Sequence, residues 1–339
     1  MISKRCPMPH ALSRRLLSSL AAGSACLTLV ACGTSDAPST AVHTAYELPG
    51  ARVYPEGIAV DARTGDSYVG SYSTGAVYRA TPNARRAEVF LPEGASGHKT
   101  ANGLKVDAAG RLWVTDSTTG VAVYDITTRA LLADFTVPGA DPRFVNDLAI
   151  TPDGTAYLTD SVRAVVYRVT PDQLAAARAQ GGRGELTPRF DLRSVLPPSE
   201  PGAFTLNGIV ADPAGRYLLT VDMPRGELYR IDLTQEASPI GEVTLRGGDL
   251  RQGDGLELRE GTLWAAHNTT NTISRWTISD DGATATLAQQ RTDETLAIPT
   301  TLARSGDRTL IVSSQFDKGG PMAPGSPKTP FAVVTLDGI

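Results

Sequence analysis

The chain has 339 residues, of which 41% are hydrophobic, so it is long enough to bury a sizeable core. Its 36 acidic and 32 basic side chains give a formal net charge of −4. An acidic surface repels phosphate backbones, so nucleic acid is excluded as an expected partner.

The first 31 residues have the composition of an export signal. Four basic residues precede an apolar stretch over residues 16–31, which is shorter than the roughly 20 apolar residues of a membrane span and fits the hydrophobic region of a secretory signal. The stretch ends in LVACG at residues 29–33. This ending resembles the bacterial lipobox, in which the cysteine becomes the lipidated first residue of the mature chain. An ordinary secretory signal with a chance cysteine is the alternative.

We therefore predict a lipoprotein signal peptide over residues 1–31, lipidation of Cys32 and a flexible tether over residues 32–44. The protein would be exported and anchored by its lipid to the bacterial cell envelope. Cys6 and Cys26 would leave with the signal, so a disulfide, a thiolate metal site and a cysteine nucleophile are excluded for the mature chain. Loss of four basic residues would change the formal charge from −4 to −8.

A short phrase then recurs along the chain. Its copies are EGIAVD (56–61), NGLKVD (102–107), NDLAI (146–150), NGIVAD (207–212), DGLEL (254–258) and a degraded PTTLA (299–303). They lie roughly 45 residues apart, except for about 61 residues between the third and fourth copies. Turn-forming Asp, Gly and Pro residues separate each copy from a second run of β-formers. Repeats of this length built from strands are typical of propeller blades.

The predicted fold is all-β: one domain over residues 45–339, a six-bladed β-propeller with four-stranded antiparallel blades around a central channel. A helix over residues 173–180, ended by glycines at 181, 182 and 184, explains the long interval and is expected on the rim. Strands over residues 42–48 and 331–336 are expected to share one blade and close the ring. Residues 317–330, rich in Gly and Pro, are expected to form a loop over one face.

The first residue of each copy opens the innermost strand and should face the channel. Five copies place an oxygen-bearing side chain there: Glu56, Asn102, Asn146, Asn207 and Asp254. Such oxygens suit a hard cation such as Ca²⁺ or Mg²⁺, whereas softer metals prefer imidazole or thiolate. Asn-Gly and Asp-Gly are also common tight-turn dipeptides, so a turn-forming role is the alternative. The glutamate in the first copy and the missing glycine in the third count against it.

At these phrases the chain resembles the SMP-30/gluconolactonase/regucalcin-like family of six-bladed propellers, and more distantly the squid-type diisopropyl fluorophosphatases. The resemblance spans nearly the whole chain after residue 50. It implies one divalent cation held by Glu56, Asn146, Asn207 and Asp254, with Ca²⁺ expected and Mg²⁺, Mn²⁺ and Zn²⁺ as alternatives. It also implies that Asn102 lines the substrate pocket. Asp254 would act as base or nucleophile while the cation polarises a carbonyl or phosphoryl oxygen.

Two positions depart from the family pattern. Ile58 stands where many members have proline, and Arg143 lies three residues before Asn146, where some sugar lactonases have a substrate-binding arginine two residues before. Arg143 is nevertheless a candidate for substrate binding, as is His267, for which a structural role is the alternative. Three aspartates at the ends of second strands are expected to hydrogen-bond neighbouring backbone: Asp116, Asp160 and Asp222.

The predicted function is that of a metal-dependent hydrolase that opens a lactone or related ester of a small-molecule substrate, as a monomer. The alternative is a non-catalytic, lipid-anchored propeller that binds a ligand or a protein and holds at most a structural cation.

Overall fold

The computed structural model describes residues 41–339. The predicted signal peptide, the lipid site at Cys32 and most of the predicted tether lie outside the described residues. The last tether residues, 42–44, already belong to a strand. Within the described part of the chain, no helix is long and apolar enough to cross a membrane.

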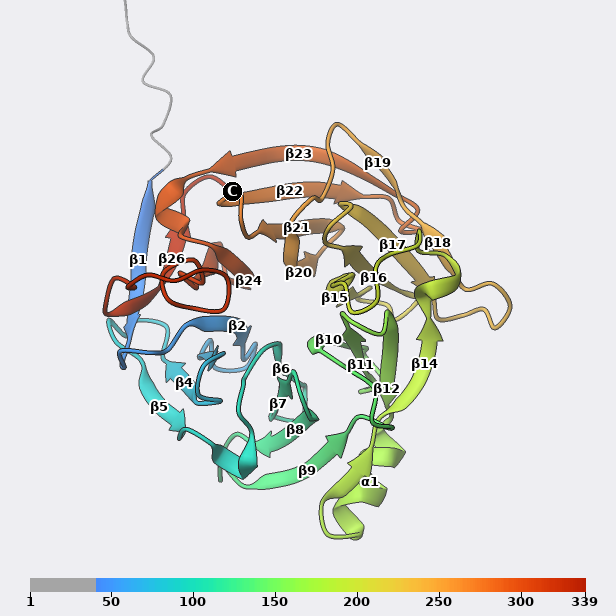
Figure 1. Cartoon of the computed structure of the whole chain (residues 1–339), viewed down its shortest axis with the longest axis horizontal. Helices are drawn as coiled ribbons and strands as arrows, with labels where there is room; N and C mark the ends of the chain where they lie inside the picture. The colour runs from blue at the N-terminus through green and yellow to red at the C-terminus, as the bar shows by residue number, and fades with distance from the viewer. Residues whose placement is uncertain (1–40) are drawn as a thin grey trace, which may run out of the picture. The chain divides into compact units, whose positions relative to one another are not determined.

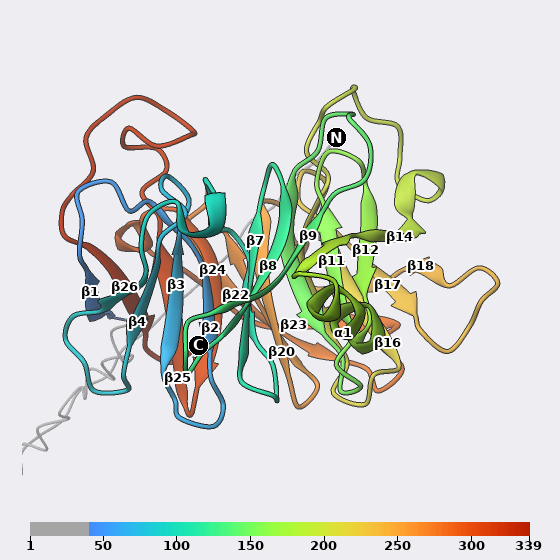
Figure 2. The same cartoon turned by 90° about the horizontal axis from the view of Figure 1, so that it is seen from below.

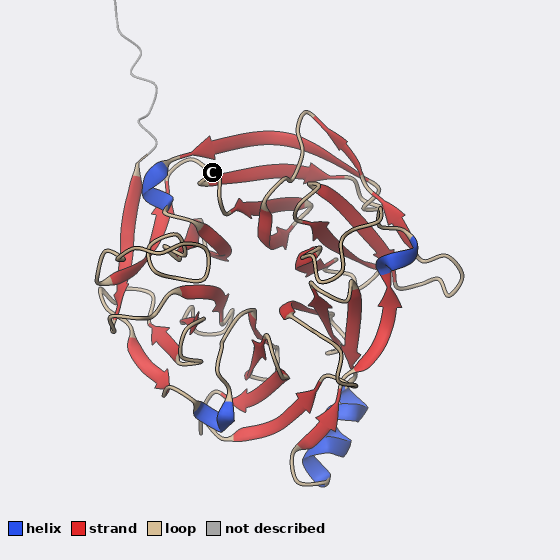
Figure 3. Ribbon diagram, in the orientation of Figure 1, coloured by secondary structure: helices blue, strands red, loops and turns tan. Residues whose placement is uncertain are grey.

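Six small sheets form a closed ring around a central channel, as predicted (Figures 1 and 3). The first three blades consist of β2 (Pro55–Val60), β3 (Ser67–Ser71), β4 (Val77–Ala80) and β5 (Glu88–Leu91); β6 (Leu104–Val106), β7 (Arg111–Asp116), β8 (Gly120–Asp125) and β9 (Leu131–Thr136); and β10 (Val145–Ile150), β11 (Ala156–Asp160), β12 (Val165–Val169) and β14 (Thr187–Asp191). The fourth and fifth consist of β15 (Leu206–Ala211), β16 (Tyr217–Asp222), β17 (Glu227–Asp232) and β18 (Ile240–Glu242); and β20 (Gly253–Arg259), β21 (Thr262–His267), β22 (Thr272–Ile278) and β23 (Thr284–Thr292).

The sixth blade closes the ring by combining both ends of the propeller. It consists of β24 (Pro299–Ser305), β25 (Arg308–Ser313), β26 (Phe331–Leu336) and β1 (Val42–Leu48). β1 pairs antiparallel with β26, which sets Leu48 opposite Phe331. The predicted mixed blade is confirmed, and it leaves the first strand of the domain paired rather than exposed at an edge.

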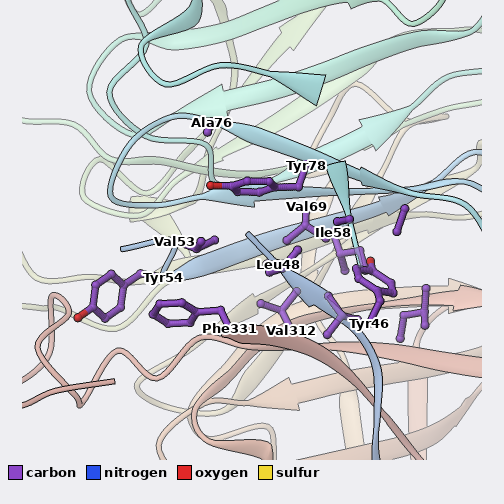
Figure 4. Packing of buried hydrophobic residues seen from close by; sticks show 14 of the residues in the cluster. Tyr46, Leu48, Val53, Tyr54, Ile58, Val69, Ala76, Tyr78, Val312 and Phe331 are labelled. Atoms are coloured by element: carbon purple, nitrogen blue, oxygen red, sulfur yellow. The ribbon is translucent and has the colours of Figure 1, made fainter. Parts of the chain in front are cut away.

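The hydrophobic core lies between neighbouring sheets. Six clusters of buried apolar side chains each join two adjacent blades. In the cluster between blades six and one, Leu48, Val312 and Phe331 pack together with Ile58 and Val69 (Figure 4). Because each blade is covered on both faces, its strands are apolar on both sides.

The helix and two outer strands complete the rim. α1 (Pro171–Ala179) is capped by Thr170, whose hydroxyl accepts a hydrogen bond from the Gln173 amide, and it lies outside the ring (Figure 1). Two strands that the repeat did not predict pair in parallel with a neighbouring blade: β13 (Arg183–Glu185) with β9 and β19 (Thr244–Arg246) with β23. Three short 3₁₀ helices lie in loops: η1 (Ala95–Gly97), η2 (Leu192–Ser194) and η3 (Glu294–Leu296).

Candidate metal and substrate site

The innermost strands of five blades carry a β-bulge at the channel-facing residue. In β2 the pairing register shifts between Pro55 and Ile58, on either side of Glu56. The same shift occurs in β10, β15, β20 and β24. A bulge leaves a residue unpaired and redirects its side chain. In blade two, regular pairing starts at Leu104, and the Asn102 amide before it donates to the Thr115 carbonyl oxygen at 3.0 Å.

The glycine after the channel-facing residue is required by the neighbouring blade. None of these four glycines has a positive φ: Gly57, Gly103, Gly208 and Gly255. A Cβ atom on Gly57 would overlap the carbonyl oxygen of Asn102, and one on Gly208 would overlap that of Asp254. The tight-turn alternative is therefore wrong, because a hairpin turn built on Asn-Gly needs positive φ angles. Glycine stands here because the inner strands approach closely around the axis.

Hydroxyl groups fix the main chain of the site residues across the blade interfaces. Three threonines of the preceding blade donate to carbonyl oxygens of the site, namely Thr115 to Asn146 at 2.6 Å, Thr159 to Asn207 at 2.8 Å and Thr300 to Glu56 at 2.7 Å. The inner ends of the blades are thus held in one arrangement before any ligand binds.

The five predicted oxygen donors come together around the channel. They are buried, with exposed fractions from 1% for Asn102 to 8% for Glu56. All five line a cavity of about 300 Å³. All but Asn102 also line a second cavity, large enough for about one water molecule, deeper between the inner strands.

The amide groups leave oxygen atoms free for a ligand. The Asn146 Nδ2 atom donates to Ser161 Oγ at 3.0 Å, and its Oδ1 atom is buried without a hydrogen-bond partner in the described structure. Neither amide atom of Asn102 has a partner among residues 41–339. Buried, unpaired oxygens of this kind are costly unless a ligand satisfies them. The Asn207 Nδ2 atom lies 3.4 Å from the sulfur of Met223.

The donor set fits a hard divalent cation. Its two carboxylates and its amide oxygens are the ligand types that Ca²⁺ and Mg²⁺ take. Among the residues that the structure describes, no three His, Cys, Asp or Glu side chains are placed to hold a metal ion by themselves, so a cation here would also need the amide oxygens. The chemistry of the set therefore favours Ca²⁺ or Mg²⁺ over Zn²⁺, which prefers nitrogen and sulfur ligands.

The carboxyl groups of Glu56 and Asp254 are buried close to other carboxyl groups, which raises their pKa values. Burial raises the pKa of Glu56 well above its usual value, and Asp254 and Asp147 raise it further. Burial also raises the pKa of Asp254 to about 7, against the opposing effect of a 2.9 Å hydrogen bond from Asn268 Nδ2. No Lys, Arg or His lines either cavity in the described structure. A cation at this position would supply the missing positive charge.

Asp147 adds a third carboxyl group at a position where four of the other copies have glycine. Its Oδ1 atom accepts a hydrogen bond from the Leu148 amide at 2.8 Å, and its Oδ2 atom one from the Ile209 amide at 3.4 Å. Burial raises the pKa of Asp147 as well. The sequence showed that the glycine was missing, but only the structure places this carboxyl group beside the deeper cavity.

Two residues predicted to bind the substrate, Arg143 and His267, do not lie beside the five oxygen donors. Arg143 is half-buried and donates from Nη1 to the Val137 carbonyl oxygen at 3.3 Å. His267 is buried, donating from Nδ1 to the Arg251 carbonyl oxygen at 2.8 Å and accepting at Nε2 from Ser274 Oγ at 2.7 Å. Neither residue lines either cavity. The contacts of His267 match its structural alternative.

The site contains a second repeated position that the sequence reasoning missed. The residue directly after the second strand of a blade contributes Tyr72, Met223 and Asn268 to the larger cavity. The equivalent residue of blade three, Ser161, orients Asn146. Counting one residue beyond each predicted second strand would have found Ser161, Met223 and Asn268. It would have missed Tyr72, because β3 runs one residue further than the predicted strand.

The strand-end aspartates hold the loops that lead into the site. Asp116 accepts hydrogen bonds from the Lys99 and Thr100 amides at 2.7 and 3.1 Å, and Asp160 accepts one from the Phe144 amide at 3.0 Å. These loops end at Asn102 and Asn146. The predicted backbone role is confirmed for both aspartates. Asp222 instead pairs with Arg225 at 3.0 Å.

A buried ion-pair cluster anchors the loop before Asn102. His98 lies 3.7 Å from Asp116 and 3.5 Å from Asp134, which are ion-pair separations longer than hydrogen bonds. Burial alone would lower the pKa of His98, but the two carboxylates outweigh it and raise the pKa to about 9.

This raised pKa predicts a pH-dependent stability difference between the wild type and His98→Gln. The advantage of the wild type should be complete below about pH 6.5 and should be lost as pH rises through about 9, because only protonated His98 gains from the carboxylates. Its size is up to about 3 kcal/mol. Urea unfolding at pH 6, 8 and 10 measures it, and a difference that stays constant over this range would contradict the assignment.

Comparison with solved structures establishes the fold. The chain matches no protein-family model and no curated protein sequence. Its structure is similar to that of a gluconolactonase from Xanthomonas campestris, at 18% identity and a TM-score of 0.59, covering 88% of this chain and 90% of that one. It is similar to a calcium-binding regucalcin from Agrobacterium tumefaciens at 17% identity and a TM-score of 0.59, covering 88% and 94%.

The same fold also occurs in a protein with another activity. A virginiamycin B lyase from Staphylococcus aureus has a TM-score of 0.54 at 13% identity, covering 88% of this chain and 99% of that one. At such identities the likeness concerns the fold and not the reaction. The chain is thus a six-bladed β-propeller with a fold like that of the gluconolactonase and regucalcin structures.

Proposed function

We propose that this protein is a divalent-cation-dependent hydrolase that opens a lactone or a related ester. The observation that carries the proposal is the buried set of carboxylates and unpaired amide oxygens at the base of a 300 Å³ cavity that no basic side chain of the described structure lines. Ca²⁺ is the cation that we propose. A gluconolactonase and a calcium-binding regucalcin have a similar fold, so the proposed reaction and cation are compatible with this fold.

Each residue of the oxygen set would have its own role in hydrolysis. A divalent cation held by Glu56, Asn146, Asn207 and Asp254 would polarise the substrate carbonyl group. Asp254 would act as the general base that takes a proton from the attacking water. Asn268 fixes the Asp254 carboxyl group for this step. Asn102, with both amide atoms unpaired, would hydrogen-bond the substrate.

A direct test follows hydrolysis of a panel of lactones, arylesters and phosphotriesters by the purified protein. Activity should disappear after treatment with EDTA and return with Ca²⁺. Cation binding without turnover of any substrate would overturn the hydrolase and favour the non-catalytic binding protein.

We also propose that the protein is anchored to the cell envelope through a lipid on Cys32, as its lipobox-like sequence indicates. The wild type should partition into the detergent phase after cloud-point extraction, whereas Cys32→Ser should move to the aqueous phase. Cys26→Ser is the matched control, because Cys26 would leave with the signal. Wild-type protein in the aqueous phase would contradict the anchor.

A further inference from the structure

The larger cavity separates polar from apolar groups. Its polar lining consists of the oxygen set together with Asn268. The remaining wall is formed mainly by aromatic and methionine side chains: Tyr72, Phe144, Phe204, Met223, Phe316 and Met322. A ligand that reaches the oxygen set therefore has its remaining atoms against apolar surface.

The aromatic side chains are fixed in pairs contributed by different blades. The rings of Phe144 and Phe204, which precede blades three and four, meet edge to face with centroids 4.7 Å apart. The rings of Tyr72 and Phe316, from blades one and six, lie 5.2 Å apart. Such contacts stabilise an aromatic wall beyond simple burial. The wall is thus built into the cavity before a ligand arrives.

One side of the wall comes from the loop between β25 and β26. This loop carries Phe316 and Met322. It rises above one face of the ring, at the upper left of Figure 2. It is tied down by hydrogen bonds from the Tyr54 hydroxyl to the Lys318 carbonyl at 3.1 Å and from Gln315 Nε2 to the Lys328 carbonyl at 2.9 Å. The predicted loop over one face is therefore part of the cavity.

Apolar surface is also exposed at the mouth. In residues 41–339 only five large hydrophobic side chains are exposed, and two of them, Phe204 and Met322, line this cavity with exposed fractions of 41% and 44%. Exposed apolar groups gathered at a cavity mark a binding surface. Because Phe204 and Met322 are exposed, they contribute little to the free energy of folding. A ligand that covers them would gain binding free energy from the burial of their apolar surface.

From this arrangement we propose that the substrate is a lactone or ester with an apolar body, alkyl or aryl, rather than a polyhydroxylated sugar lactone. The inference rests on the proposed function for the reaction but on the wall for the substrate class. Each hydroxyl group of a sugar needs a hydrogen-bond partner when it is buried, and among the described side chains of the wall only Tyr72 carries a hydroxyl group. Arg143, the predicted substrate-binding arginine, does not line the cavity.

The kinetic test compares γ-lactones with alkyl side chains of increasing length and a phenyl-substituted lactone with glucono-δ-lactone, all in Ca²⁺. We expect kcat/KM to rise up to about fourfold per added methylene group and to be at least about 100-fold lower for the sugar lactone. Phe204→Ser and Met322→Ser should reduce the gain per methylene. Leu131→Ser is the matched control, since Leu131 is equally exposed at 43% but lies on β9, away from the cavity.

A binding measurement separates this inference from the proposed function. Calorimetry with lactams, which resist hydrolysis, should show at least tenfold tighter binding of alkyl and phenyl lactams than of a polyhydroxylated lactam, and Phe204→Ser should weaken the former. Turnover of the sugar lactone in preference to the apolar lactones would overturn the inference and leave the hydrolase intact. Preferential binding of apolar lactams without turnover of any lactone would support the inference and overturn the hydrolase. Equal or absent binding of both lactam classes would overturn the inference.

Discussion

Asp254→Asn is expected to lower kcat/KM for lactone hydrolysis by about 10³-fold. The variant loses the charge that attracts the cation and the group that would accept the proton, while its volume and its position beside Asn268 are nearly unchanged. The fold should persist, because the main chain is held by the pairing of Gly253 and Leu256 on either side of this residue and not by the carboxyl group. Steady-state kinetics in saturating Ca²⁺, with circular dichroism as a check of folding, measures the effect.

Asp125→Asn is the matched control for this change. It makes the same substitution at the last residue of β8, where the carboxyl group accepts hydrogen bonds from the Thr128 amide and hydroxyl and lines neither cavity. Its activity should stay within about twofold of the wild type, as is usual for surface changes of at most about 0.5 kcal/mol. A folded Asp254→Asn variant with wild-type kcat/KM would remove the basis of the proposed mechanism.

The same Asp254→Asn variant is expected to be more stable than the wild type in EDTA at pH 8. The pKa of Asp254 is raised from 3.8 to about 7, so without a cation its ionisation opposes folding. A raised pKa gives stability that is complete below about pH 3.8 and lost as pH rises through about 7, which amounts to about 4 kcal/mol. Asparagine does not ionise and avoids this loss. Activity and stability should therefore change in opposite directions.

Ca²⁺ should reduce the difference in stability between the wild type and the variant. A cation bound to the charged set stabilises the wild type in proportion to its occupancy, by about 2.7 kcal/mol at a concentration 100 times Kd. The gain should be larger at pH 8 than at pH 5, because protons compete for the same carboxyl groups at the lower pH. Urea unfolding of both proteins at the two pH values, with EDTA and with Ca²⁺, tests this. An equal Ca²⁺ effect on wild type and variant would place the cation elsewhere.

The architecture and the oxygen donors were predictable because both are encoded in a repeat. The spacing of the copies indicates one blade per copy. Because each copy begins the innermost strand of its blade, Glu56, Asn146, Asn207 and Asp254 lie at one level of a closed ring. The pairing of β1 with β26 was predictable for the same reason, since a sixth blade lacked one strand. The outer strands β13 and β19 were not, because they are short segments whose partners lie on another blade.

The tertiary structure decided what surrounds these donors. Arg143 lies three residues before Asn146, and His267 pairs with Gly253 next to Asp254, but neither side chain lines the cavity. Both side chains bond to backbone carbonyl groups instead. The apolar wall that we propose selects the substrate comes from loops of several blades, at positions where residue types differ from copy to copy. A repeated phrase fixes the level and chemistry of the residues that share it. The direction of a single side chain and the meeting of loops from different blades depend on packing around the whole ring, which no local pattern contains.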